Sequence, residues 1–255
     1  MKPYYKNELT TIYNGDCLEV MDNIENVDLV ITSPPYNIIR PNSTDRGYDL
    51  YKDGMTNEEY SKWIVNIFNQ YNKLLNKNGC VLFNMSYGTE NTTVMSLTVA
   101  DIIKKTNFTL ADIIVWKKQS ATPNNVSKNK LTRIVEYIYV FCKEEDFMTF
   151  DTNKKILKQR DTGQDIYENL FNFIKAPNND SSTDINKATY SSELVSRLLK
   201  IYYTKGIVLD NFSGTGTTSY ACEQNNIKSI GIELSKLQCD YTIKRLNEIQ
   251  LKFDI

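Results

Sequence analysis

Ser33, Pro34, Pro35 and Tyr36 form the segment of this chain best suited to chemistry on a planar group. The apolar run at 27–31 precedes them and predicts a buried strand of a parallel sheet. Because prolines lack an N–H and fix φ, the Pro-Pro step ends that strand in stiff, extended backbone. We therefore expect the Pro34 carbonyl to accept a ligand hydrogen bond, the Ser33 hydroxyl to lie beside it, and the Tyr36 ring to stack on the ligand. An ordinary proline-rich turn explains the same residues equally well.

A second motif suits a nucleoside ligand. A predicted strand at 207–209, a glycine-containing turn and a predicted helix at 217–224 are followed by a strand at 229–232. Glu233 ends this last strand, 19 residues after Gly214, which is close to the spacing at which an acidic side chain binds ribose hydroxyls. The helix start suits a carboxylate or a phosphate equally, so these residues do not choose between S-adenosylmethionine and a dinucleotide. No Gly-Lys-Ser/Thr follows the glycines, which excludes a Walker-type loop.

Together the two motifs resemble the amino-methyltransferases of DNA, specifically the permuted β-group, in which the catalytic Ser/Asp/Asn-Pro-Pro-Tyr motif precedes the cofactor motif. The resemblance covers nearly the whole chain. It implies an α/β fold: a doubly wound, mostly parallel sheet of the Rossmann-like, S-adenosylmethionine-dependent methyltransferase kind, with a small inserted recognition region. We expect one methyltransferase domain over residues 1–255, with a target-recognition region at 143–185.

The resemblance also implies roles for individual residues. The catalytic residues are expected to be Ser33, Pro34, Pro35 and Tyr36. The cofactor, S-adenosylmethionine, is expected to contact Asp16, Cys17, Asp210, Phe212, Ser213, Gly214, Gly216, Thr217, Thr218 and Glu233. The chain departs from the family pattern at four positions. Histidine is usual at the position of Asn186, and proline is usual at the positions of Lys187, Ser191 and Asn211.

Composition limits the chemistry and the location. The 255 residues suffice for one large α/β domain with a full core. Histidine is absent and the five cysteines form no CxxC pair, so we expect reduced thiols, no metal site and no histidine acid–base chemistry. There is no apolar run of about 18 residues or more and no signal-peptide core. We therefore expect a cytoplasmic protein without membrane contact.

Charge is distributed unevenly along the chain. The formal net charge of −1 is unusual for a protein that binds DNA phosphates. Residues 104–160, however, contain twelve basic and six acidic side chains. Solvated surface lysines would account for this excess, but beside the two motifs a surface that faces double-stranded DNA is the better interpretation. The expected DNA contacts are Lys128, Lys130, Arg133, Lys154, Lys155, Lys158 and Arg160.

The segments between the motifs predict alternating helices and strands. A capping box at Thr56 and Glu59 predicts the start of an amphipathic helix that ends at Asn78-Gly79. Strands alternating with helices are what a doubly wound sheet requires. The strands expected after this helix are at 80–84, 110–116 and 134–141.

Residues 37–54 directly follow the catalytic motif and lack periodicity, so we expect a flap over the site. Polar and aromatic residues near strand ends are further candidates for the pocket. These candidates are Asn84, Ser86, Trp116 and Lys117.

The resemblance implies methyl transfer to the exocyclic amino group of a base flipped out of DNA. Serine at the first catalytic position favours N4 of cytosine, with N6 of adenine as the alternative. Methylation at carbon-5 is excluded because no cysteine follows a proline. Enzymes acting on RNA or on a protein glutamine normally place the cofactor motif first, and a non-catalytic DNA-binding module is the remote alternative. Besides DNA, the expected partners are a second copy in a homodimer and a cognate restriction endonuclease.

Overall fold

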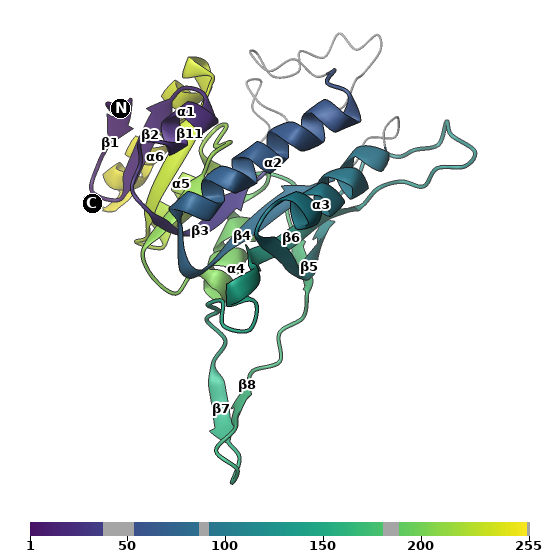
Figure 1. Ribbon diagram of the computed structural model, residues 1–255. Coiled ribbons are helices and arrows are strands. Elements are labelled where there is room, and N and C mark those ends of the chain that lie inside the picture. Colours follow the sequence, from purple (N-terminus) through teal and green to yellow (C-terminus); the bar gives the residue numbers. More distant parts are fainter. Residues whose placement is uncertain (38–53, 87–91, 181–188, 254–255) are drawn as a thin grey trace.

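A nine-stranded sheet organises the part of the chain that the computed structural model describes, namely residues 1–37, 54–86, 92–180 and 189–253 (Figure 1). The strands, in order across the sheet, are β1 (Tyr5–Lys6), β2 (Thr10–Asn14), β11 (Lys228–Glu233), β10 (Ile207–Asp210), β3 (Val27–Thr32), β4 (Leu75–Met85), β6 (Val135–Lys143), β5 (Phe108–Lys118) and β9 (Phe173–Ala176). Pairing is parallel from β2 through β4 and between β5 and β9, and antiparallel elsewhere.

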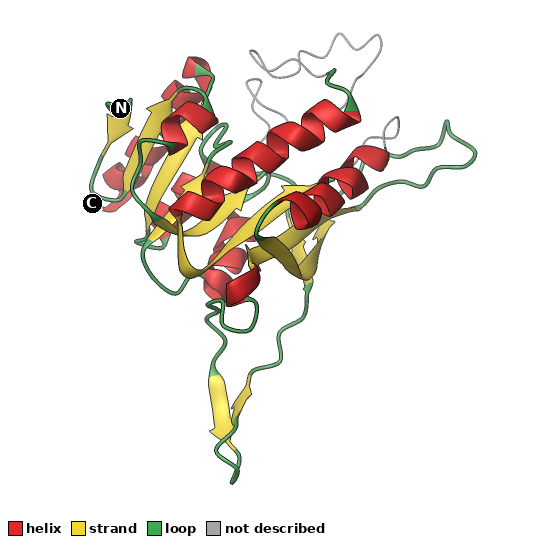
Figure 2. Cartoon of the chain, viewed as in Figure 1, coloured by secondary structure: helices red, strands yellow, loops and turns green. Residues whose placement is uncertain are grey.

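Helices cover both faces of this sheet, giving three layers (Figure 2). One face carries α1 (Cys17–Met21), α2 (Asn57–Leu74) and α3 (Thr93–Lys105), whose buried side chains form one apolar core. The other face carries α4 (Ser192–Tyr202), α5 (Thr217–Gln224) and α6 (Lys236–Phe253), and a second core lies beneath α4 and α5. The sheet is therefore buried on both sides, as parallel sheets require.

The prediction of a doubly wound, mostly parallel α/β fold is confirmed, with one local exception. Strands β5 and β6 are antiparallel neighbours, and a loop at 119–134 joins them where strict alternation predicts a helix. Antiparallel pairs need no crossover helix. This exception brings the end of β5 and the start of β6 to the same edge as the ends of β3 and β4.

The start of α2 is predicted correctly, but its end is not. Thr56 and Glu59 form both hydrogen bonds of the capping box. The helix, however, ends at Leu74, and β4 begins at Leu75 rather than at Cys80. Asn78 has a left-handed φ of 64°, and a Cβ on residue 79 would lie 2.7 Å from a β3 carbonyl. Asn78 and Gly79 thus form an irregularity within β4 and do not end the helix.

The expected recognition region at 143–185 is only partly an insertion. Its last strand, β9, pairs with β5 and belongs to the main sheet. Between β6 and β9 in the chain, β7 (Ile156–Gln159) and β8 (Asp165–Tyr167) form a hairpin that projects from the main sheet (Figure 1). The hairpin follows the end of β6 and precedes the start of β9, so it extends away from the edge where β3 and β4 end.

In the described residues, no helix combines the length and apolar character needed to cross a membrane.

Candidate active site

The two sequence motifs meet at one edge of the sheet. Parallel strands β11, β10 and β3 are neighbours, so their carboxyl ends lie side by side. The catalytic motif follows β3, the glycine turn follows β10, and Glu233 ends β11. Ligands bind at this end of open α/β sheets, outside the carboxyl ends of the strands. The predicted nucleoside site and the predicted base site are thus adjacent.

The catalytic segment is held in place by burial of its prolines and by a hydrogen bond from α2. Pro34 and Pro35 are buried, and the Tyr60 hydroxyl of α2 donates to the Pro35 carbonyl at 2.8 Å. Among the described residues, none donates a hydrogen bond to the Pro34 carbonyl. Ser33 is partly exposed next to it. The pair of acceptors that the sequence predicts is therefore present, one from a side chain and one from the backbone.

Asn37 fixes the end of this segment. Its φ of 53° lies in the left-handed region, which asparagine tolerates better than most residues. Its side chain donates to the Met55 carbonyl and accepts from the amides of Gly54 and Met55, at 2.8–3.1 Å. These bonds tie the catalytic segment to the residues just before α2. The rest of the expected flap, residues 38–53, lies outside the described residues.

The hydroxyl of Tyr36 lies in a polar cluster at the ends of three further strands. Its single proton is shared between Asn84 Oδ1 at 3.0 Å and Glu136 Oε2 at 3.1 Å, and its oxygen accepts from Ser33 Oγ at 3.2 Å. Lys118 Nζ forms an ion pair with Glu136 Oε1 at 2.8 Å.

Of the four expected pocket neighbours, Asn84 is in this cluster. Ser86 is buried just beyond the end of β4. Trp116 instead lies in the core, with Nε1 bonded to the Ala176 carbonyl at 3.2 Å. The charged pair at the site comprises Lys118, one residue beyond the expected Lys117, and Glu136, which sequence reasoning missed. Lys118 and Glu136 come together because β5 and β6 pair in antiparallel orientation, and a single sequence does not reveal that pairing.

Asp210 joins the two motifs. It is 2% exposed, and four donors reach its carboxylate. Oδ1 accepts from Thr32 Oγ1 at 2.8 Å and from the Phe212 amide at 3.1 Å, whereas Oδ2 accepts from Thr218 Oγ1 at 2.6 Å and from the Tyr190 hydroxyl at 3.0 Å. Burial raises the pKa of Asp210, and the hydrogen bonds oppose that rise. Asp210 thereby connects β3, β10, the start of α5 and the segment before α4.

Glu233 and the glycine turn form the other half of the site. Glu233 Oε2 accepts from the Gly214 amide and Oε1 from the Ser235 amide, both at 2.8 Å. Gly214 and Gly216 have left-handed φ values of 51° and 75°. A Cβ on Gly216 would lie 2.3 Å from Thr242 Cγ2, so both conformation and space require glycine there.

Asp16 and Cys17 start α1 beside this turn. Asp16 is exposed and caps the helix by accepting from the Leu18 amide at 2.8 Å. Cys17 is buried, and burial raises the pKa of its thiol to about 12, so it stays protonated. Phe212 packs edge-on against Trp63 of α2, with ring centroids 5.4 Å apart. Together with Glu233, these residues place two carboxylates and an apolar wall at the predicted nucleoside site.

Three further expected cofactor residues, Ser213, Thr217 and Thr218, are also buried. Thr218 donates to Asp210, and Thr217 Oγ1 accepts from Arg245 at 3.3 Å. Asn211, at the position where the family has proline, accepts from the Tyr71 hydroxyl at 2.5 Å and so ties the turn to α2. Among the other departures, residues 186 and 187 lie outside the described part, and Ser191 caps α4.

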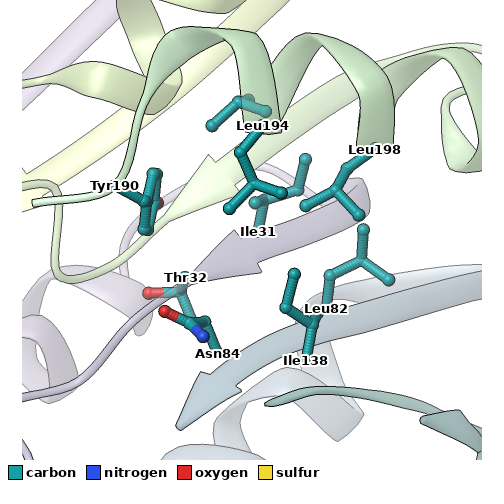
Figure 3. Close-up of a pocket in the computed structure, with 9 residues that line it drawn as sticks. Ile31, Thr32, Leu82, Asn84, Ile138, Tyr190, Leu194 and Leu198 are labelled. Atoms are coloured by element: carbon teal, nitrogen blue, oxygen red, sulfur yellow. The ribbon is translucent and has the colours of Figure 1, made fainter. Parts of the chain in front are cut away.

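A recess of about 10 Å³ lies beside the catalytic strand, between β3, β4, β6 and α4 (Figure 3). Its lining is mainly aliphatic, and Thr32, Asn84 and Tyr190 form its polar end (Figure 3). The volume is below the roughly 300 Å³ at which ligand pockets begin. We therefore interpret it as looser packing under the catalytic segment.

The expected DNA contacts fall into two groups. Lys128, Lys130 and Arg133 lie in the loop at 119–134, which leaves the sheet at the catalytic edge. The other four, Lys154, Lys155, Lys158 and Arg160, are exposed on or beside the β7–β8 hairpin. Because that hairpin extends away from the catalytic edge, the two groups of expected DNA contacts lie at different ends of the sheet (Figure 1). Within the described ranges, no cluster of three or more potential metal ligands occurs.

The comparison with protein families decides the classification. A family model for N6 and N4 methyltransferases, described as DNA methylase, matches residues 27–244. The chain belongs to this DNA methylase family. The type II methyltransferase M.ScaI of Streptomyces caespitosus is 24% identical, over 96% of this chain and 84% of the relative. The DNA adenine methyltransferase YhdJ of Escherichia coli (strain K12) is 25% identical, over 95% of this chain and 84% of the relative.

Solved structures share the fold of this DNA methylase. The PvuII DNA methyltransferase, described as cytosine-N4-specific, superposes with a TM-score of 0.75 at 20% identity, covering 96% of this chain and 88% of that one. The complex of M1.HpyAVI with SAM has a TM-score of 0.62 at 24% identity, covering 93% and 100%. The predicted family and methyltransferase fold are confirmed. The target base is not decided, since relatives of both kinds occur.

The raised pKa of Asp210 gives a testable pH dependence. Its stabilising contribution is fully present below the ordinary aspartate pKa of about 3.9 and is lost as pH rises through the raised value. The amide introduced by Asp210→Asn cannot titrate, so the unfolding free energy of wild type minus that of this variant should fall with rising pH. Thr218→Val removes a bond that favours the carboxylate and should extend the loss to higher pH. Urea unfolding from pH 4 to 8 measures both, and a difference that rises with pH contradicts this assignment.

Proposed function

We propose that this DNA methylase transfers a methyl group from S-adenosylmethionine to the exocyclic amino group of a base flipped out of duplex DNA, and that the base is cytosine, methylated at N4. The observation that carries the proposal is the pair of acceptors, Ser33 Oγ and the Pro34 carbonyl, held beside the cofactor edge by Asp210 and Tyr60. N6 of adenine is the alternative. The presence of serine rather than aspartate at position 33 supports cytosine.

The residues of the cofactor half fit S-adenosylmethionine. Glu233 lies at the tip of β11, the position from which an acidic side chain binds ribose hydroxyls in this kind of fold. Phe212 and Trp63 supply an apolar wall, and the backbone turn at Gly214 and Gly216 permits close approach. When bound, S-adenosylmethionine supplies an electrophilic methyl group on a sulfonium. The chain's own contribution is to hold the acceptor pair next to it.

The acceptor pair acts on the geometry of the amino group. The two N–H groups of an exocyclic amine can donate to Ser33 Oγ and to the Pro34 carbonyl. These bonds draw the nitrogen out of conjugation with the ring and direct its lone pair toward the cofactor edge. Positioning of this kind supplies most of the rate enhancement, at the cost of roughly a few kcal/mol for flipping the base. The Tyr36 ring, whose hydroxyl is fixed by Asn84 and Glu136, is placed to stack on the base.

DNA approaches the catalytic edge in this proposal. Lys128 and Lys130 are exposed on the loop that starts there, and Arg133 is half-buried at its base. They are therefore the proposed phosphate contacts. A cognate restriction endonuclease is a proposed partner, which the type II names of relatives such as M.ScaI and M.BamHI support.

Methylation of duplex DNA in vitro, followed by mass spectrometry of the nucleosides, tests the function. We expect N4-methylcytosine. Ser33→Ala should slow single-turnover methylation about 10- to 100-fold, corresponding to a lost hydrogen bond of about 1–3 kcal/mol, with cofactor affinity unchanged in calorimetry. N6-methyladenine as the sole product would refute the choice of base. Cofactor binding without any methylated DNA would refute the activity.

Salt dependence of DNA affinity tests the phosphate contacts. Lys128→Ala/Lys130→Ala should reduce the slope of log K against log salt by about 0.9 per lost contact. Lys154→Ala/Lys158→Ala on the hairpin is the matched control and should leave the slope unchanged. A second control, Lys205→Ala/Lys228→Ala, changes exposed lysines before β10 and at the start of β11. If only the hairpin pair changes the slope, DNA does not approach the catalytic edge as proposed.

A further inference from the structure

A directed chain of hydrogen bonds leaves the catalytic serine. Ser33 Oγ donates to the Tyr36 hydroxyl at 3.2 Å, and that hydroxyl donates to Glu136 Oε2 at 3.1 Å. Both donors therefore point the same way, from the acceptor pair toward a carboxylate. The other carboxylate oxygen, Oε1, accepts from Lys118 Nζ at 2.8 Å.

The proposed reaction needs such a chain. A neutral amino group that accepts a methyl group becomes a cation and must then lose a proton. Serine is a poor base, and the Pro34 carbonyl cannot retain a proton. Aspartate at the first motif position could take the proton directly, but this chain has none there. A carboxylate therefore has to be reached indirectly.

We infer that Glu136 is the terminal proton acceptor of the methylation reaction, reached from the methylated base through Ser33 and Tyr36. The inference rests on the proposed function. The N–H bond of the methylated ammonium breaks, and its electron pair stays on nitrogen. The proton bonds to Ser33 Oγ while the serine proton moves to the Tyr36 oxygen and the tyrosine proton moves to Glu136 Oε2. Serine and tyrosine end unchanged, and the carboxylate becomes a neutral acid.

The surroundings of Glu136 suit this role. Its side chain is 16% exposed, which shields the chain of bonds yet leaves a route for the proton to water. The charged or titratable groups recorded against it are Lys118 from β5 and Tyr36 from the segment after β3. The neighbouring β4 contributes the neutral amide of Asn84, which shares the Tyr36 hydroxyl. The ion pair with Lys118 orients the carboxylate before transfer.

Glu136 could instead serve only to orient Tyr36, and glutamine separates the two roles. The side-chain oxygen of Glu136→Gln can still accept from the Tyr36 hydroxyl, so orientation is kept, but the amide cannot take up the proton. Glu136→Asp retains a carboxylate on a shorter side chain. Glu25→Gln changes an exposed glutamate before β3, at the opposite end of that strand, and is the matched control.

The experiment is single-turnover methylation of duplex DNA at pH 7, with product identified by mass spectrometry. We expect Glu136→Gln to be at least about 10-fold slower than wild type. Glu136→Asp should recover part of the rate, and Glu25→Gln should match wild type. Calorimetric cofactor affinity and the fluorescence of a 2-aminopurine placed next to the target base should be unchanged in Glu136→Gln.

Two outcomes overturn the inference. One is a Glu136→Gln enzyme with the wild-type rate. The other is a slow Glu136→Gln enzyme that also loses the base-flipping signal and is not rescued by aspartate, since that pattern indicates a role in orientation alone. In both cases wild type still methylates DNA. Failure of wild type to methylate any base would instead refute the proposed function.

Discussion

The buried carboxylate of Asp210 is the interaction on which the site depends. A carboxylate with this little exposure is stable only when its lone pairs are occupied, and here four donors from three parts of the chain occupy them. Because Thr32 directly precedes the catalytic motif and Thr218 lies in the first turn of α5, the Asp210 side chain sets the position of the acceptor pair relative to the cofactor turn. Methyl transfer depends on this separation, since reacting atoms must be held within a fraction of an ångström.

Burial on both faces of the sheet makes this arrangement rigid. The two apolar cores enclose the strands, and the polar groups of the site lie at the carboxyl edge. Tyr60 and Tyr71 project from α2 through one core to hold the Pro35 carbonyl and Asn211. Tyr190 reaches Asp210 from the other face. Tyrosine hydroxyl groups from both faces of the sheet thus position the site.

Local signals in the sequence predicted local structure well. The capping box, the Pro-Pro step and the glycine turn depend on neighbouring residues, so the start of α2, the end of β3 and the β10–α5–β11 unit could be read directly. The end of α2 could not, because Leu74 and Leu75 are buried whether the chain is helix or strand. The short strand β9 lacks a pattern of its own and forms by pairing with β5. Glu136, Lys118 and Tyr190 join the site only through pairings between distant segments.

The central claim is that Asp210 couples the catalytic strand to the cofactor turn, and a double-mutant cycle tests it most directly. Thr32→Val and Thr218→Val each remove one donor without changing side-chain size much, and the single-turnover rate of DNA methylation is measured for both and for the double variant. We predict a coupling energy of at least about 0.5 kcal/mol between them. Effects that add to within about 0.3 kcal/mol would contradict the claim, because the two contacts would then act independently.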